Sequence, residues 1–306
     1  MNDSLTAVDG IRVGHWHDDV LATGCSVILS PPQGCVASGE ARGAAPGTRE
    51  LALLQPTKMV DRVHAICLSG GSAFGLDAAS GVMRYLQEKD VGFVTPFARV
   101  PIVPAAVIFD LATGQVAAPQ AEHGYQAAMQ ASSQPVANGR YGAGRGASCG
   151  KYLGFEGAQY GGLGSAALTV GDCTVAALAV VNAFGDVVDE QGQVIAGARY
   201  ENGTRPDQRS IKDVFARGAE GQNTTLVVMA TNATISKAQA HALAQSAHVG
   251  IAQSIRPSHT VVDGDTSFVI STCHVASPPM LTLSISVQQV VAEAVREAAR
   301  EANRSS

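Results

Sequence analysis

The sequence predicts a layered α/β protein in which helices cover the outer faces of β-sheets. Short apolar runs separated by Gly, Pro and Asp recur along the whole chain, a pattern typical of strands. Longer stretches with apolar residues at helical spacing lie between some of these runs. No regular alternation of strand and helix is visible, so a doubly wound dinucleotide-binding fold is the weaker interpretation.

The apolar runs that we expect to form strands often carry apolar residues on both faces. They span residues 25–31, 64–71, 91–96, 105–111, 173–182, 225–231, 267–272 and 280–287. Three helices are expected, over residues 73–88, 236–255 and 286–303. The first has apolar Phe74, Leu76, Val82 and Leu86, the second opens with the N-cap residue type Ser236, and the third is rich in Ala, Val and Glu.

The composition suits a large core and a surface partly covered by other subunits. Hydrophobic residues make up 46% of the 306 residues, and charged residues only 15%, against about 25% in typical proteins. The net charge of -5 is spread along the chain without runs of Lys or Arg. This distribution argues against nucleic acid or an anionic membrane as the partner.

The cysteines and the first residues bear on the compartment. Six cysteines are scattered with no CxxC pair, which favours reduced, buried thiols over a disulfide scaffold. The opening MNDSLTAVDGIRVGHW lacks a charged start followed by an apolar core, so no signal peptide is expected. No apolar stretch reaches transmembrane length. The expected compartment is the cytoplasm.

A glycine-rich stretch, GGSAFGLDAA (70–79), opens the first expected helix. It is not a P-loop, a GxGxxG fingerprint or a GxSxG nucleophile elbow. It is either a tight strand-to-helix turn or a loop that lines a substrate pocket with its backbone N–H groups, with Gly70, Gly71, Ser72 and Phe74 as the candidates. The glycine-rich stretch 142–150 is either pocket lining or a flexible loop, since glycine serves both.

No stretch predicts a metal site. The cluster HWHDD (15–19) lacks a helical HExxH pattern or a cysteine partner and is expected to be a solvated turn. Asp263-Gly264-Asp265 lacks the repeated acids of a calcium loop.

The stretch GQNTTLVVMATN (221–232) passes from a polar loop into an apolar run. Thr224 is therefore either the first residue of a strand or a nucleophile that becomes active when the Asn223–Thr224 bond breaks. An N-terminal threonine carries its own base, because its α-amino group has a pKa near 7.7–8.0. Such a bond can break when the Thr224 hydroxyl attacks the Asn223 carbonyl and water hydrolyses the resulting ester. Gly221 and Gln222 would belong to a strained, accessible loop.

Four stretches carry a resemblance to a known family: HAICLSGGSAFGLDAASGV (64–82), VPIVPAAVIFDL (100–111), NTTLVVMATN (223–232) and HTVVDGDTSFVIST (259–272). Together they resemble the DmpA-type aminopeptidases and nylon oligomer hydrolases, which are N-terminal-nucleophile hydrolases that cut themselves into two chains. The resemblance runs from about Gly10 to the C-terminal helix. It implies a single αββα sandwich domain, 1–306, that is cut into chains 1–223 and 224–306.

The resemblance also implies a set of catalytic residues. Thr224 matches the nucleophile, and Asn182 matches an asparagine whose amide donates to the developing oxyanion. Lys151 matches a lysine beside the nucleophile, and Asp263 and Asp265 match two acids that orient the threonine amine. From the residues alone, Asn182 is expected to form a turn at a strand end, Lys151 to be a solvated surface charge, and Asp263-Gly264-Asp265 to be a hairpin turn.

The implied function is hydrolysis of a small peptide or a linear amide oligomer, with no metal or organic cofactor and with a homo-oligomer of four or more subunits. Phe74 departs from the family, because it stands where relatives carry tyrosine. The Asp-Gly-Asp pair follows the nylon-hydrolase branch, which puts a general peptidase substrate in question. The alternatives are an acyltransferase of the ornithine acetyltransferase type and a binding protein of the same fold that never cuts itself.

Overall fold

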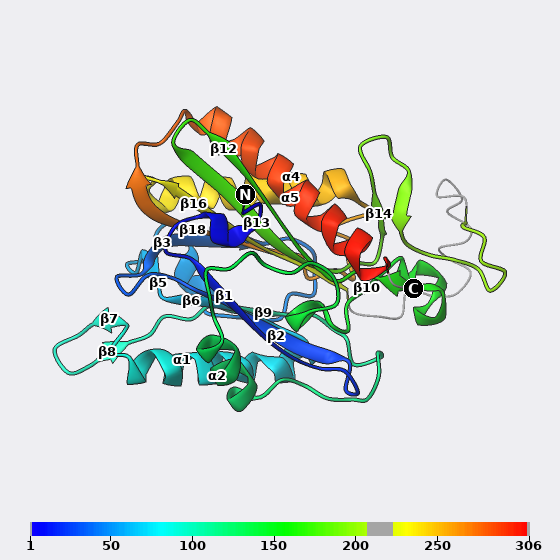
Figure 1. The fold of residues 1–306 in the computed structure, drawn as a ribbon, viewed down its shortest axis with the longest axis horizontal. Helices are drawn as coiled ribbons and strands as arrows, with labels where there is room; N and C mark the ends of the chain where they lie inside the picture. Colours follow the sequence, from blue (N-terminus) through cyan, green and yellow to red (C-terminus); the bar gives the residue numbers. More distant parts are fainter. Residues whose placement is uncertain (1, 207–222, 305–306) are drawn as a thin grey trace.

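Two β-sheets lie face to face in the computed structural model, which describes residues 2–206 and 223–304 (Figure 1). The first sheet, in spatial order, consists of β1 (Arg12–Asp18), β2 (Thr23–Leu29), β6 (Ala65–Ser69), β9 (Ala105–Val107) and β4 (Thr48–Arg49). The second consists of β12 (Leu163–Val170), β13 (Cys173–Asn182), β16 (Thr224–Ala233), β18 (Thr266–Val275), β3 (Cys35–Ala41) and β5 (Arg62–Val63).

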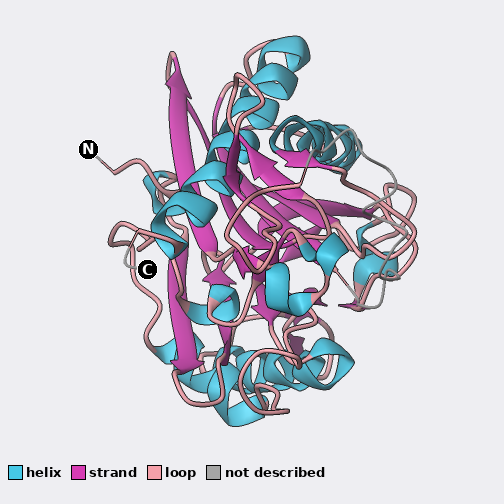
Figure 2. Cartoon of the chain, turned by 90° about the vertical axis from the view of Figure 1, so that its right-hand side faces the viewer, coloured by secondary structure: helices cyan, strands magenta, loops and turns pink. Residues whose placement is uncertain are grey.

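Helices cover the outer face of each sheet. Helices α1 (Ala78–Glu88) and α2 (Ala121–Met129) pack on the first sheet, and α4 (Lys237–Ser254) and α5 (Met280–Ala302) pack on the second. Seen from the side, the strands occupy the middle of the molecule between the helical layers (Figure 2). The order helix, sheet, sheet, helix confirms the αββα sandwich that the family resemblance implies.

Short elements complete the chain. The remaining strands are β7 (Phe93–Val94), β8 (Arg99–Val100), β10 (Ser148–Cys149), β11 (Gln159–Tyr160), β14 (Asp186–Val188), β15 (Val194–Ala196) and β17 (Ile255–Arg256). The 3-10 helices are η1 (Leu5–Ala7), η2 (Leu51–Leu54), η3 (Ser72–Asp77), η4 (Gly142–Gly144), η5 (Lys151–Leu153) and η6 (Phe155–Gly157).

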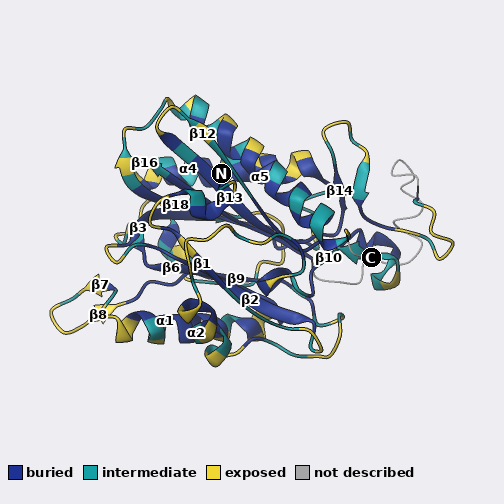
Figure 3. Ribbon diagram, viewed as in Figure 1, coloured by how far each residue is buried: buried dark blue, intermediate teal, exposed yellow. Residues whose placement is uncertain are grey.

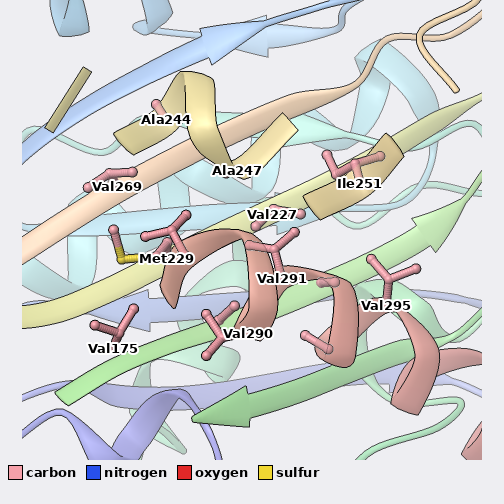
Figure 4. Close-up of a cluster of buried hydrophobic side chains, with 14 of the residues drawn as sticks. Val175, Val227, Met229, Ala244, Ala247, Ile251, Val269, Val290, Val291 and Val295 are labelled. Atoms are coloured by element: carbon pink, nitrogen blue, oxygen red, sulfur yellow. The ribbon is translucent and has the colours of Figure 1, made fainter. Parts of the chain in front are cut away.

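Strand β16 shows why apolar runs in this sequence form strands with two buried faces. Leu226 and Val228 point into the core between the two sheets, whereas Val227 and Met229 point into the core beneath α4 and α5 (Figure 4). Alternate residues of a strand face opposite sides, so a strand between two apolar layers reads as a continuous apolar run. Each such buried side chain contributes about 1.5–3 kcal/mol. The central strands are accordingly buried along most of their length (Figure 3).

Most of the predicted strands are confirmed. Six of the eight runs contain strands of the two main sheets, namely 25–31, 64–71, 105–111, 173–182, 225–231 and 267–272. The run 91–96 instead contributes β7 to a separate hairpin with β8, where Val94 is 65% exposed.

The prediction of a strand over residues 280–287 is wrong, because this run forms the first turns of α5. Its alternation of apolar residues with Thr and Ser matches the period of a strand, which would bury Leu281, Leu283, Ile285 and Val287 together. The helix buries Leu283 and Val287, which are one turn apart, and leaves Leu281 and Ile285 73% and 48% exposed. The apolar face that Leu283 begins continues into the predicted helix 286–303, and this continuity decides in favour of a helix.

The other predicted helices are confirmed. Ser236 caps α4, because its hydroxyl accepts a hydrogen bond from the Gln239 N–H at 3.2 Å while the Gln239 side chain accepts one from the Ser236 N–H at 2.8 Å. The stretch 73–88 begins as the 3-10 helix η3 and becomes α-helical at Ala78. Across residues 2–206 and 223–304, no helix has the length and apolar character needed to cross a membrane.

Candidate active site

The sheet register brings the predicted site residues to one end of the second sheet. Strand β16 runs antiparallel to β13, and Thr224 at its start lies opposite Asn182 at the end of β13. On its other side β16 runs parallel to β18, with Leu226 opposite Thr266. The acids Asp263 and Asp265 immediately precede β18, so they lie beside the start of β16 as well.

Two hydrogen-bond donors contact the carbonyl oxygen of the Asn223–Thr224 peptide bond. The Thr224 hydroxyl donates to the Asn223 carbonyl oxygen at 2.5 Å, and the Gly264 N–H donates to the same oxygen at 2.7 Å. The Asn223 N–H donates to the Val262 carbonyl at 3.0 Å, which fixes the chain just before the bond. Both residues are buried, so the Thr224 hydroxyl is held against the carbonyl that precedes it. Gly221 and Gln222 of the predicted loop lie outside the described residues.

Lys151 is a buried amine rather than a solvated surface charge. It begins η5, and its Nζ donates to the Asn182 side-chain oxygen at 2.7 Å and to the Asn182 carbonyl at 2.9 Å. Burial lowers the pKa of Lys151 to about 7, although the nearby Cys149, Asp263 and Asp110 act to raise it. A neutral amine has two N–H groups and one lone pair, so Lys151 can make both contacts with Asn182 and still accept a proton near neutral pH.

Asn182 joins Lys151 to the loop that follows β9. Its side-chain oxygen also accepts from the Ser148 N–H at 3.1 Å, and its Nδ2 donates to the Phe109 carbonyl at 2.9 Å. These contacts fix the plane of the amide beside Thr224. One of the two Nδ2 hydrogens is occupied by Phe109 in the uncut chain.

The two acids differ in their partners. Asp263 accepts from the Thr260 N–H at 2.8 Å and the Thr260 hydroxyl at 2.6 Å. Asp265 accepts from the Thr225 N–H at 2.5 Å and therefore holds the backbone next to Thr224 directly. Burial raises the pKa of Asp263, and the neighbouring charge of Asp265 raises it further.

A cavity of about 270 Å³ opens at Thr224. It is lined by Ala45, Pro46, Gly47, Ser72, Ala73, Val107, Ile108, Phe109 and Thr224. Larger hollows of about 600 and 570 Å³ lie along α5, and one of about 460 Å³ is lined by residues that include Ser148 and Phe155, but none of these three is lined by any of the five predicted catalytic residues. The cavity at Thr224 can present a substrate to this cluster, because Thr224 lines it.

The pocket candidates divide into one that lines this cavity and three that do not. Ser72 lines it, whereas Gly70 and Gly71 do not, and Phe74 is 74% exposed on the surface. The Gly71 N–H donates to the buried carboxyl of Asp110 at 2.6 Å. The loop is thus a tight turn that brings Ser72 and the neighbouring Ala73 to the cavity.

The sequence did not single out three contributors to this cluster. Asp110 accepts from Gly71 and Thr23, and burial raises its pKa. Gly264 supplies the N–H to the Asn223 carbonyl, and His259 lies 2.7 Å from Asp265. The sequence offered only weak signals for two of them: Asp110 is a polar residue near the end of the run 105–111, and His259 is a histidine six residues before Asp265.

The cluster HWHDD is not the solvated turn that the sequence predicts. Residues 15–18 belong to β1, and His15 is partly buried with its Nδ1 2.8 Å from the Ser26 hydroxyl. Among the residues that the structure describes, no three His, Cys, Asp or Glu side chains are grouped so that they could hold a metal ion.

Known proteins are similar to this chain over most of its length. The family described as Peptidase family S58 matches residues 3–305. An uncharacterized aminopeptidase of Mycobacterium leprae is 42% identical over 292 residues, covering 88% of this chain and 78% of that protein. A 6-aminohexanoate-oligomer endohydrolase of Agromyces sp. is 32% identical over 277 residues, covering 88% of this chain and 75% of that protein.

A solved structure supports the fold. The L-aminopeptidase D-Ala-esterase/amidase of Ochrobactrum anthropi, described as a variant of the Ntn hydrolase fold, is similar with a TM-score of 0.70. The similarity covers 97% of this chain and 85% of that one, at 18% sequence identity. With the family match over nearly the whole length, the chain belongs to peptidase family S58 and is a hydrolase of amide bonds.

Proposed function

We propose that the chain cuts its own Asn223–Thr224 bond and that the exposed Thr224 is the nucleophile of amide hydrolysis. The observation that carries this proposal is the double contact at the Asn223 carbonyl, which receives the Thr224 hydroxyl at 2.5 Å and the Gly264 N–H at 2.7 Å. A nucleophile held against a carbonyl whose oxygen already has a hydrogen-bond donor is arranged for acyl transfer.

The cut proceeds in two steps. Neutral Lys151 takes the hydroxyl proton of Thr224, and Oγ1 bonds to the Asn223 carbonyl carbon while the Gly264 N–H stabilises the negative charge on oxygen. The C–N bond then breaks, the nitrogen of Thr224 takes up the proton, and an ester joins Asn223 to Oγ1. Water hydrolyses this ester, which leaves the Asn223 carboxylate at the end of chain 1–223 and a free amine on Thr224.

In the mature enzyme the Thr224 amine takes over as the base. It accepts the proton of Oγ1 as the hydroxyl attacks the substrate carbonyl, and it passes this proton to the leaving amine. Asn182 donates to the oxyanion from Nδ2, and Lys151 keeps the amine neutral by charge repulsion. Asp263 and Asp265 orient the amine, and water finally releases the acyl group from Oγ1.

The proposed substrate is a small linear amide, either a short peptide or an aliphatic amide oligomer. The cavity at Thr224 is modest, at about 270 Å³, and its lining is mainly apolar with Ser72 as a polar contact. The relatives include an aminopeptidase and an enzyme named for 6-aminohexanoate oligomers, so both substrate kinds belong in the first assay. We also propose that the enzyme works as a homo-oligomer of four or more subunits, which its low charged fraction of 15% favours.

The experiment is an activity assay of the purified protein on an aminoacyl amide panel and on a 6-aminohexanoate oligomer, with Thr224→Ala and Thr224→Ser as variants. Thr224→Ala is expected to lose both self-cleavage and hydrolysis, and Thr224→Ser to keep part of both, because serine retains the hydroxyl and the amine. Activity retained in Thr224→Ala would overturn the nucleophile assignment. Adding a free amine acceptor separates the alternative, since an acyltransferase would form the acylated amine in preference to the acid.

A further inference from the structure

His259 lies between Asp265 and the end of α4. Its Nδ1 is 2.7 Å from Asp265 Oδ2, and its backbone N–H donates to the same oxygen at 3.1 Å. Its Nε2 is 3.2 Å from the carbonyl oxygen of His248. The His259 backbone has a φ of 54°, in the left-handed region that side chains other than glycine seldom adopt. This conformation turns both of the His259 donors toward one carboxylate oxygen.

The chemistry of these partners decides the protonation state of the ring. A carbonyl oxygen can only accept, so Nε2 must carry a hydrogen. Both oxygens of Asp265 accept from backbone N–H groups, Oδ1 from Thr225 and Oδ2 from His259, as the oxygens of a carboxylate do. Nδ1 must then carry a hydrogen too, since it faces a carboxylate. A neutral imidazole can donate from only one nitrogen, so the contacts require an imidazolium.

Of the two neighbouring histidine rings, His259 and His248, only that of His259 carries a charge. The neighbouring His248 ring lies edge-on at 4.9 Å, and burial lowers its pKa to about 4, so it is neutral. Its Nε2 lies 3.2 Å from the carbonyl of Glu40 in β3. The other charged group near His259 is Arg42, which is paired with Glu40 at 3.0 Å and acts to lower the pKa of His259.

We propose that His259 is a positioning residue: its imidazolium holds Asp265 as a carboxylate against the Thr225 N–H and so fixes Thr224 for attack. The ion pair itself rests on the contacts above, while its effect on the reaction rests on the proposed function. Asp263 and Asp265 are two buried acids separated by one residue, and before the chain is cut no Thr224 amine exists to balance them. Because the cut requires Lys151 as a neutral amine, His259 supplies the cation that balances this pair, at Asp265.

The pH dependence follows from this arrangement. Burial alone would lower the pKa of His259, but the hydrogen bond and the charge of Asp265, together with the His248 carbonyl, raise it above its ordinary value. The imidazolium is therefore present below this raised pKa and is lost as the pH rises through it. Self-cleavage and hydrolysis should decline on the alkaline side of the profile for this reason.

The first test is an NMR titration of the imidazole nitrogens in the uncleaved Thr224→Ala chain, which does not depend on any activity. His259 is expected to titrate above the ordinary range of histidine, with both ring nitrogens protonated at neutral pH. Asp265→Asn removes the counter-ion, and the pKa of His259 should then fall. A His259 that titrates at or below the ordinary value, or one that Asp265→Asn leaves unchanged, would overturn the ion pair.

The second test measures the rate of self-cleavage against pH in wild type, His259→Asn and His274→Asn. His274 is an exposed histidine near the end of β18 and serves as the matched control. His259→Asn is expected to slow cleavage about 10- to 100-fold, the loss that a misplaced reacting group causes, and to abolish the alkaline decline. A slower rate with the decline intact would mean that His259 is merely structural, and this result would overturn its positioning role. A wild-type chain that never cuts itself would instead refute the proposed function and leave the titration to decide the ion pair.

Discussion

The surroundings of Lys151 favour the neutral form of its amine. It is 3% exposed, its Nζ contacts two oxygens of Asn182, and burial lowers its pKa to about 7. A buried lysine of this kind is a candidate base, because its neutral form is well populated at neutral pH.

The first prediction concerns the pH dependence that Lys151 imposes on self-cleavage. Below a pH of about 7 the amine is protonated and cannot accept the Thr224 proton, so the rate should rise as the pH increases through this value. The measurement is the disappearance of full-length chain made by cell-free synthesis and transferred to buffers of different pH. Lys151→Arg keeps a cation that does not deprotonate and should slow the cut about 100-fold or more, since a general base contributes about 100- to 10,000-fold. Wild-type cleavage in Lys151→Arg would contradict the role of the neutral amine.

At the scale of elements, the turn before β18 determines what faces the Asn223 carbonyl. Gly264 donates its N–H to this carbonyl, and a Cβ added at Gly264 would collide with the Ala45 carbonyl. Either the backbone at Gly264 or the backbone at Ala45 would therefore have to move.

The second prediction is that Gly264→Ala slows self-cleavage, because the displaced N–H no longer supports the oxyanion. The expected loss is about 100-fold, in the range found when an oxyanion donor is removed. Gly171→Ala provides the control for Gly-to-Ala strain, since Gly171 also has a turn conformation, with a φ of 58°, and has open space where a Cβ would be placed. Equal cleavage rates in Gly264→Ala and wild type would show that this N–H does not contribute.

The third prediction tests α5, where the sequence favoured a strand. Leu283 of α5 faces the core and is 1% exposed, whereas Leu281 of the same helix is 73% exposed. Leu283→Ala should lower the free energy of unfolding by about 2–5 kcal/mol, and Leu281→Ala should change it by less than about 0.5 kcal/mol. Denaturant unfolding of the Thr224→Ala chain measures both without interference from cleavage. Similar losses in the two variants would contradict the burial pattern of the helix.

The sequence predicts which segments form strands and helices better than it predicts how these elements pair and pack. The apolar runs identify the central strands because β13, β16 and β18 are buried on both faces. The parallel pairing of β16 with β18, which brings Asp265 to Thr225, leaves no trace in the local pattern. Only the resemblance implied that Asp265 acts beside Thr224. Lys151 looks solvated in sequence because its burial depends on η5 folding against the end of β13.

For the whole molecule, the proposed cut at Asn223–Thr224 would leave the sandwich intact. The chain 224–306 would contain β16, β18, α4 and α5, and β16 lies between β13 and β18 in the second sheet. The new terminus would therefore start on a strand that is held on both sides by hydrogen bonds.

The fourth prediction is that the two chains remain associated after the cut. They share the core between the sheets, in which Leu178 of the first chain packs with Val228 and Phe268 of the second. Gel filtration under native conditions should yield one species that contains both chains, and denaturant should be needed to separate them. Separation of the chains in native buffer would contradict the shared core.

The intact mass and N-terminal sequence of the purified protein show whether the chain cuts itself before Thr224. Self-cleavage at Asn223–Thr224 should give two chains from the 31.4 kDa precursor, of about 23 kDa for 223 of 306 residues and about 8.5 kDa for the remaining 83, with the smaller one beginning at Thr224. Thr224→Ala should give one uncut chain. An active wild-type protein that remains a single chain, or a cut that exposes a residue other than Thr224, would contradict the account.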